Sequence, residues 1–157
     1  MNTIWMFWGA REAWTTRRSL ENGCLYFPFE DLEKDCSHLG NETLIRSELS
    51  GRLKEDQIQC FDLLSNGLRQ GDWIIIPGDM GHHYHMGQVT GNYHFEWDSD
   101  YGLHHFRRVD WFQRDMPVVS LPNFYSESRY LSMQQPVILP PQEAEWFQQP
   151  LQLAVGF

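Results

Sequence analysis

Hydrophobic positions change their period several times along the first part of the chain, and each change predicts a new element. Residues 3–8 form a β-prone run with strand alternation. From Ala10 to Glu21 the apolar positions recur every three or four residues, which predicts a helix that stops at Asn22-Gly23. Cys24 to Phe29 predicts a second strand, and Pro28 ends it or confines it to a sheet edge.

Helical spacing returns after a polar stretch, Glu30 to Asn41, that predicts a loop. Apolar residues four positions apart indicate a helix over 42–53, which Gly51 weakens. The same spacing continues over 58–68 and predicts a second helix, with Asp56 as its expected N-cap. The two helices should therefore pack side by side before the chain returns to strands.

Three short runs rich in β-branched and aromatic residues follow, each bounded by turn residues. They are Trp73 to Pro77, Tyr84 to Phe95 and His104 to Phe112. We interpret them as three consecutive strands of a mostly antiparallel sheet. Strands and helices in this order predict an α+β fold.

Six prolines then divide the remaining chain into short pieces. We expect a helical turn over 125–133, a strand over 137–139 and a helix over 143–149. Because this segment retains large apolar residues, it should pack back on the sheet. The prediction is one domain over residues 1–157, with a core at about 3–112 and a Pro-rich C-terminal extension at 113–157.

Composition narrows the class of protein. The chain has 157 residues, of which 41% are hydrophobic, enough for one domain with a sizeable core. It lacks an apolar run of membrane-spanning length and a signal-peptide pattern, so we expect a cytoplasmic protein without a membrane partner. Its three cysteines form no C-x-x-C pair and indicate neither a disulfide framework nor a zinc ribbon.

Charge argues against one class of partner. Twelve Lys and Arg against 21 Asp and Glu give a net charge of −9, which disfavours non-specific binding to a polyanion. A local basic face can still exist on an acidic protein. Whether the arginines cluster is therefore the feature to examine.

Several segments, taken in order, resemble a known family. They are Trp-Met-Phe at 5–7, Gly-Asp at 71–72, Pro77, Gly-Gln-Val-Thr-Gly-Asn-Tyr at 87–93 and His-Phe-Arg-Arg-Val-Asp-Trp at 105–111. This pattern is similar to the PUA-like/EVE-type domain at the N-terminus of Mrr-like and McrB-like restriction proteins, a relative of the YTH readers. The resemblance covers about residues 3–112.

The resemblance implies a PUA-like, mixed β pseudo-barrel with flanking helices. It implies a non-catalytic reader, without a cofactor, that flips a modified base such as 5-methylcytosine or 6-methyladenine into an aromatic pocket. It also implies a restriction or phage-defence setting, with a separate nuclease or NTPase as partner. The expected ligand is modified DNA, and RNA remains open. Trp8-Gly9 departs from the family pattern, which often has a small or basic residue there.

Aromatic residues are the first candidates for the pocket. By resemblance, the modified base would sit beside the first strand, and the candidate walls are Trp5, Trp8, Trp73 and Tyr93. Rings at strand ends make good stacking platforms for a flat base. The alternative is that most of these rings belong to the hydrophobic core.

Basic residues are the candidates for nucleic-acid backbone contacts. Arg11, Arg17 and Arg18 should line the first helix. His105 and Arg107 share a strand face, and a guanidinium fork suits phosphate oxygens. The alternative for Arg107 is an exposed structural residue. Arg108 points to the opposite face, where it could pair with Asp110, so these two are not among the candidates.

The sequence has few motifs that would indicate a metal site or an enzyme. The histidines of 82–85 could contribute to a transition-metal site, but the sequence shows no metal-ligand motif. It also shows no hydrolase elbow, Walker motif, His-Glu-x-x-His or paired nuclease carboxylates, so we expect no enzyme. The main rival is an acidic protein-interaction or inhibitory subunit that reuses the fold. A histidine-based metalloenzyme is a third possibility.

Overall fold

The computed structural model describes residues 3–6, 13–27, 29, 32–78, 82–97, 101–117, 137–138 and 145. Its strands are β1 (Ile4–Met6), β2 (Cys24–Phe27), β3 (Trp73–Pro77), β4 (His83–Phe95), β5 (His105–Pro117) and β6 (Val137–Ile138). Its helices are α1 (Ala13–Asn22), α2 (Glu42–Leu49), α3 (Glu55–Asp62) and the π-helix η1 (Leu63–Gly67). Strands and helices alternate as the sequence predicts, which confirms an α+β fold.

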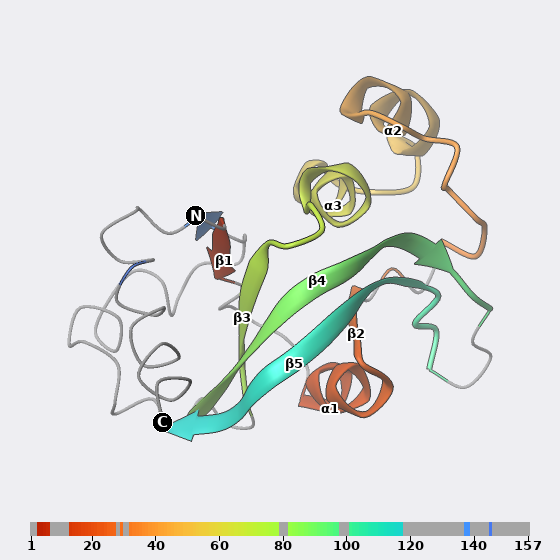
Figure 1. The fold of residues 1–157 in the computed structure, drawn as a ribbon. Coiled ribbons are helices and arrows are strands. Elements are labelled where there is room, and N and C mark those ends of the chain that lie inside the picture. The colour runs from red at the N-terminus through yellow and green to blue at the C-terminus, as the bar shows by residue number, and fades with distance from the viewer. Residues whose placement is uncertain are drawn as a thin grey trace.

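One mixed sheet organises these elements, in the order β2-β5-β4-β3-β1-β6. All its described pairs are antiparallel except β1 with β3, which run parallel. β4 and β5 form the long twisted centre, α2 and α3 lie towards one end of it, and α1 lies beside β2 and β5 (Figure 1). Within the described residues the edge strands β2 and β6 do not pair with each other, so the sheet is open and the expected pseudo-barrel is not confirmed.

Short strands at the two ends of the chain meet at one side of the sheet. Ile4 aligns with Trp73 in the parallel pair, and Met6 aligns with Val137 in the antiparallel pair. The predicted strand at 137–139 therefore exists as β6 and lies against β1. The predicted turn at 125–133 lies outside the described residues, as does the helix at 143–149 apart from Glu145.

Helix α2 begins where the sequence predicts and ends early. The Asn41 side chain accepts a hydrogen bond from the N–H of Leu44 at 3.0 Å, which caps the first turn. The helix ends at Leu49, two positions before Gly51, in line with the weakening expected there. Its apolar residues Ile45 and Leu49 are both buried.

The N-cap of the second helix lies two positions before the residue predicted for it. Lys54 occupies the N-cap position of α3, and its N–H donates to the Gln57 side chain at 2.9 Å. Asp56, the expected cap, lies inside the first turn, where its carboxylate accepts the Gln57 N–H at 3.0 Å. The cap prediction is therefore wrong by two positions, although a carboxylate still favours the positive end of the helix.

A single large apolar cluster joins the helices to one face of the sheet. From the sheet it takes Leu25, Ile74, Ile76, Val89, Val109 and Trp111, and from the helices Ile45, Leu49, Ile58, Phe61, Leu64 and Leu68. Strand alternation turns the intervening residues to the other face. There Ile4, Met6, Ile75 and Met86 are also buried. No helix in the described part of the chain has the length and hydropathy needed to cross a membrane.

Gly87 lies on β4 directly against side chains of β5. A Cβ atom at this position would lie 2.5 Å from Val109 Cγ1 and 2.7 Å from Trp111 Cε3. We expect Gly87→Ala to destabilise the fold by about 1–3 kcal/mol, because a side chain must be forced into a packed site. Urea unfolding measures the change. Gly40→Ala is the control, since a Cβ there meets nothing within 4 Å, and equal stability of the two variants would contradict the packing argument.

Candidate nucleic-acid interface

Trp5 lies on β1 beside a carboxylate. Its ring is half-buried against the large apolar cluster, and its Nε1–H donates to Asp72 Oδ2 at 3.3 Å. The same oxygen accepts the N–H of Arg69 at 2.9 Å. The pair therefore combines a flat ring with a fixed hydrogen-bond acceptor at the junction of β1 and β3.

Trp73 lies on the opposite face from Trp5. In the parallel pair Trp5 aligns with Ile74 whereas Trp73 aligns with Ile4, and neighbouring residues of a strand point to opposite faces. The Trp73 ring is 9% exposed and packs on Phe112 with ring centroids 5.0 Å apart. Trp5 and Trp73 therefore cannot wall one pocket in this structure, and Trp8 lies outside the described residues.

Tyr93, another predicted pocket wall, belongs to a buried chain of hydrogen bonds. Its hydroxyl lies 2.6 Å from His105 Nδ1, and His105 Nε2 lies 2.7 Å from the carbonyl oxygen of Leu32. Because a carbonyl only accepts, Nε2 carries the proton and Nδ1 accepts the Tyr93 hydroxyl. The hydroxyl oxygen in turn accepts the N–H of Cys36 at 3.3 Å. These bonds fasten the loop at Leu32 and Cys36 to the sheet.

Burial sets the protonation state of this chain. His105 is fully buried, and its removal from water lowers its pKa to about 4. Burial also raises the pKa of the Tyr93 hydroxyl. His105 was expected to contact a phosphate, but it is neutral and has both ring nitrogens engaged inside the protein. Because His105 is buried, the expected contact with a phosphate is not possible in this structure.

Arg107 is buried on the same face as His105. The guanidinium is 2% exposed and donates to three carbonyl oxygens: Gly91 at 2.8 Å, Leu64 at 2.9 Å and Leu68 at 2.7 Å. Alternation correctly predicts that Arg107 and His105 share a face, but that face is the interior. Arg107 therefore holds η1 against β4 and offers no surface for a phosphate.

The arginines of α1 are nearer the surface. Arg17 is exposed, while Arg18 is partly exposed and pairs with Glu21 at 3.6 Å. Arg11 lies outside the described residues. Of the predicted backbone contacts, the structure thus leaves Arg17 and Arg18 in position to meet a ligand.

Arg108 is exposed, on the opposite face from Arg107. Its Cζ lies 5.3 Å from the ring centroid of Phe106, and its Nη1 lies 3.8 Å from Cys24 Sγ. No ion pair of the described residues joins it to Asp110, so that expected pairing is wrong. Arg108 therefore adds an exposed positive charge, which the sequence had suggested would be neutralised by Asp110.

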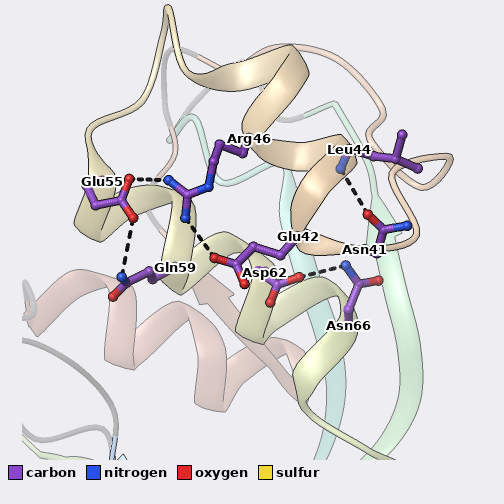
Figure 2. Close-up of polar contacts among 8 residues, drawn as sticks. All are labelled: Asn41, Glu42, Leu44, Arg46, Glu55, Gln59, Asp62 and Asn66. Carbon is purple, nitrogen blue, oxygen red and sulfur yellow. Dashed lines mark hydrogen bonds and ion pairs between the residues drawn. The ribbon is translucent and has the colours of Figure 1, made fainter.

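Basic residues of the helical pair are neutralised by carboxylates. Figure 2 shows Arg46 between Glu42 and Glu55, with one guanidinium nitrogen on each. Lys34 pairs with Glu48 at 3.1 Å. Since α2 and α3 together carry five acidic residues and one arginine, this side of the molecule is the less suitable one for a polyanion.

The histidine segment does not form a cluster of ligands. His82 and His83 are exposed, whereas His85 is buried and its Nδ1 accepts the N–H of Asp115 at 3.0 Å. Across the described ranges no three His, Cys, Asp or Glu residues are grouped as metal ligands.

Asp72 is the residue that sequence reasoning used without assigning a role. It was recognised only as part of the Gly71-Asp72 step before β3. Its backbone also joins the sheet, because its carbonyl accepts the N–H of Val89 at 2.9 Å. The position of this carboxylate, directly before a buried strand, could have marked Asp72 as a site residue. Its contact with Trp5 could not be predicted, because it depends on the parallel pairing of β1 with β3.

Comparison with solved structures supports the fold. The YTH domain of Zygosaccharomyces rouxii MRB1, solved with N6-methyladenosine RNA, superposes with a TM-score of 0.52 at 13% identity, covering 94% of this chain and 83% of that one. The Mmi1 YTH domain, solved in complex with RNA, gives 0.53 at 8% identity, covering 98% and 80%. At these identities the likeness shows a shared α+β fold, and the link to Mrr-like and McrB-like proteins stays a prediction.

Comparison of sequences is less informative about function. No curated protein matches the chain. A family model described as a domain of unknown function matches residues 8–132, which is most of the sequence. The chain therefore belongs to the DUF8426 family and has a fold similar to that of YTH domains.

Proposed function

We propose that this protein is a non-catalytic reader that binds a modified base in a nucleic acid. The observation that carries the proposal is the likeness of nearly the whole chain to two YTH domains, both solved with RNA and one with N6-methyladenosine. RNA is therefore the ligand to test first, with modified DNA as the second.

Trp5 supplies the stacking surface for this role, and Asp72, which is 8% exposed, is the proposed acceptor at the edge of its ring. An indole stacks on any flat base, and a carboxylate accepts an N–H from the exocyclic amine of adenine or cytosine. N6-methyladenine keeps one such N–H. Since the Trp5 nitrogen already bonds Asp72, the ring and the acceptor are held in one geometry before a base arrives.

The free-energy cost of unstacking a base makes a single strand a better ligand than a duplex. A base that is already unpaired needs little unstacking, whereas extrusion from a duplex costs roughly a few kcal/mol. Arg17 and Arg18 on α1 are the proposed contacts to the backbone, with Arg11 and Trp8 retained as proposed members of the site. A restriction or phage-defence setting, with a nuclease or NTPase on a separate chain, is the finer part of this proposal.

Replacing Trp5 tests the reader directly. We expect Trp5→Ala to weaken binding of a short single-stranded RNA carrying N6-methyladenosine by about tenfold, because stacking is worth roughly 1–3 kcal/mol per base. The preference over adenosine should fall by up to about fourfold, because the ring also loses its contact with the N6-methyl group, whose burial is worth about 0.8 kcal/mol. Trp5→Phe should keep part of the preference. Fluorescence anisotropy with matched labelled oligonucleotides, and with duplex DNA carrying cytosine, 5-methylcytosine, adenine or 6-methyladenine, measures it.

The control is Leu44→Ala, which removes an exposed apolar side chain on α2, away from Trp5. It should leave the preference unchanged. If the wild-type protein binds all modified and unmodified strands equally, or binds none, the reader proposal fails.

An acidic protein-interaction or inhibitory subunit is the second candidate. The net charge of −9 favours it, and so does the burial of Arg107 and His105, which removes two expected contacts from the surface. Failure to bind any nucleic acid at low salt would make this the leading function.

A further inference from the structure

Rings and guanidinium groups gather at the β2-β5-β4 side of the sheet. We call Arg18, Trp97, Tyr101, His104, Phe106 and Arg108 the ring band. Strands β3 and β4 separate β5 from β1, so the rings of the ring band lie apart from Trp5, and Arg18 is the one residue shared with the proposed reader contacts. None of its aromatic residues was among the predicted pocket walls.

The Trp97 ring lies flat against His104 and is exposed to solvent. Its ring stacks on His104 with centroids 4.6 Å apart and planes 14° from parallel. His104 is 1% exposed, and its carbonyl accepts the N–H of Glu96 at 2.8 Å, which fixes the supporting ring to the end of β4. The Trp97 side chain is nevertheless 56% exposed. An indole supported on one face and accessible elsewhere is a ready stacking surface.

Tyr101 brings a second exposed ring close to a positive charge. It is 45% exposed, and the Cζ of Arg18 lies 4.5 Å from its ring centroid. Arg108, which is exposed, extends over Phe106 in the same manner at 5.3 Å. Two guanidinium groups are thus positioned by rings. Nη1 of Arg18 faces Glu21 and Nη1 of Arg108 lies near Cys24 Sγ, which leaves Nη2 of each as the donor for an anion.

Acidic residues also lie at this place, and exposed Asp110 shares a face of β5 with Arg108. Glu21 pairs with Arg18, and Glu96 is exposed beside Trp97. They reduce the field of the two arginines. A ligand bound here must therefore gain its affinity from stacking at least as much as from charge.

We propose that the ring band binds a single strand of nucleic acid, with bases stacked on Trp97 and Tyr101 and phosphate oxygens on Arg108 and Arg18. Every base has a π-face, so such binding tolerates any sequence and needs no modification. This inference goes beyond the proposed reader function, because it assigns a second surface that would position a strand whichever base is read.

The test is binding of an unmodified, labelled uridine strand of about 12 nucleotides, followed by anisotropy at about 50 mM and about 200 mM salt. We expect Trp97→Ala to weaken binding by about tenfold, and Trp97→Phe to stay within about threefold of wild type. Arg108→Gln should lower the slope of log affinity against log salt by about 0.7. Leu44→Ala, with a similarly exposed apolar side chain outside the ring band, should bind as wild type does.

Two results would overturn the inference. One is a Trp97→Ala variant that binds the strand as tightly as wild type. The other is a wild-type protein that does not bind any unmodified single strand at the lower salt, which would instead favour a protein ligand for the ring band.

The outcome separates this inference from the reader proposal. Loss of modification preference in Trp5→Ala, with Trp97→Ala unaffected, supports the reader alone. Weaker unmodified binding in Trp97→Ala, with no modification preference in wild type, supports the ring band alone. Circular dichroism of each variant establishes that it is folded.

Discussion

Replacement of Arg107 by methionine is expected to destabilise the fold by about 3–5 kcal/mol. Three buried carbonyl oxygens lose their donor, at roughly 1–3 kcal/mol each, and part of this loss is offset because a charge no longer has to be buried. Burial lowers the pKa of the Arg107 guanidinium and the charge of Asp72 raises it, but arginine stays protonated in both the folded and unfolded chain.

The position of η1 explains why Arg107 matters. The N–H of Leu68 bonds the Leu63 carbonyl at 2.8 Å, the last turn of the π-helix. The next N–H, of Arg69, donates to Asp72 instead, so the Leu64 carbonyl lacks a helical partner. Arg107 supplies one there and another at Leu68, which caps the helix from the sheet.

Urea unfolding of Arg107→Met, Arg107→Lys and Arg108→Met measures this effect. The lysine variant should recover part of the loss, since an ammonium group cannot reproduce the planar fork. Arg108→Met removes the neighbouring, exposed guanidinium and should change stability by less than about 0.5 kcal/mol. Equal midpoints for Arg107→Met and Arg108→Met would refute the capping role.

The second large effect is a dependence of stability on pH that originates at His105. Its folded pKa of about 4 lies below the ordinary value of 6.5, because burial disfavours the charged ring. Between these two values the unfolded chain binds a proton that the folded chain does not. Stability is therefore complete above about pH 6.5 and declines as the pH falls towards 4, by roughly 3 kcal/mol in all.

Other groups near His105 affect its titration less than burial does. The Leu32 carbonyl and the charge of Asp35 raise the pKa of His105, while His104 lowers it. The pKa of Asp35 itself is lowered, chiefly by the N–H of Ser37, so this carboxylate titrates below the relevant window. The range from about pH 6.5 to 4.5 thus reports mainly on histidines.

The measurement is the free energy of unfolding at several pH values for the wild type, His105→Gln and His94→Gln. The glutamine at 105 lowers stability at neutral pH by breaking the chain to Tyr93, but its stability should change less between pH 6.5 and 4.5. His94→Gln is the control, because this histidine is exposed and lies outside the hydrogen bonds that join His105 to Tyr93 and Leu32. A wild-type slope in His105→Gln would show that the acid sensitivity arises elsewhere.

Local pattern was enough to predict most of the secondary structure. β3 has the bounds that its apolar run indicates, and α2 begins after the Asn41 cap, because strand and helix periods are properties of neighbouring residues. η1 was predicted as ordinary helix. Its π geometry depends on Asp72 and Arg107, which come from other parts of the chain.

The candidate site was harder to predict, because it depends on which face of the sheet is covered. Alternation places His105 and Arg107 together, but only the packing of α3 and η1 makes that face the interior. Trp5 and Trp73 were grouped because both are aromatic and both belong to strands. Their separation follows from the parallel register of β1 with β3, and no local pattern contains that register.

The parallel placement of β1 has a consequence for synthesis on the ribosome. β1 can pair with β3 only after Trp73 has been synthesised, and with β6 only after Val137 has been synthesised. At a translation rate of roughly 5–20 residues per second, this apolar strand emerges on the order of ten seconds before its last partner. β1 precedes the other described strands in the chain but completes its pairing only when β6 is made, and in that interval its unpaired edges are open to chaperones or to other nascent chains.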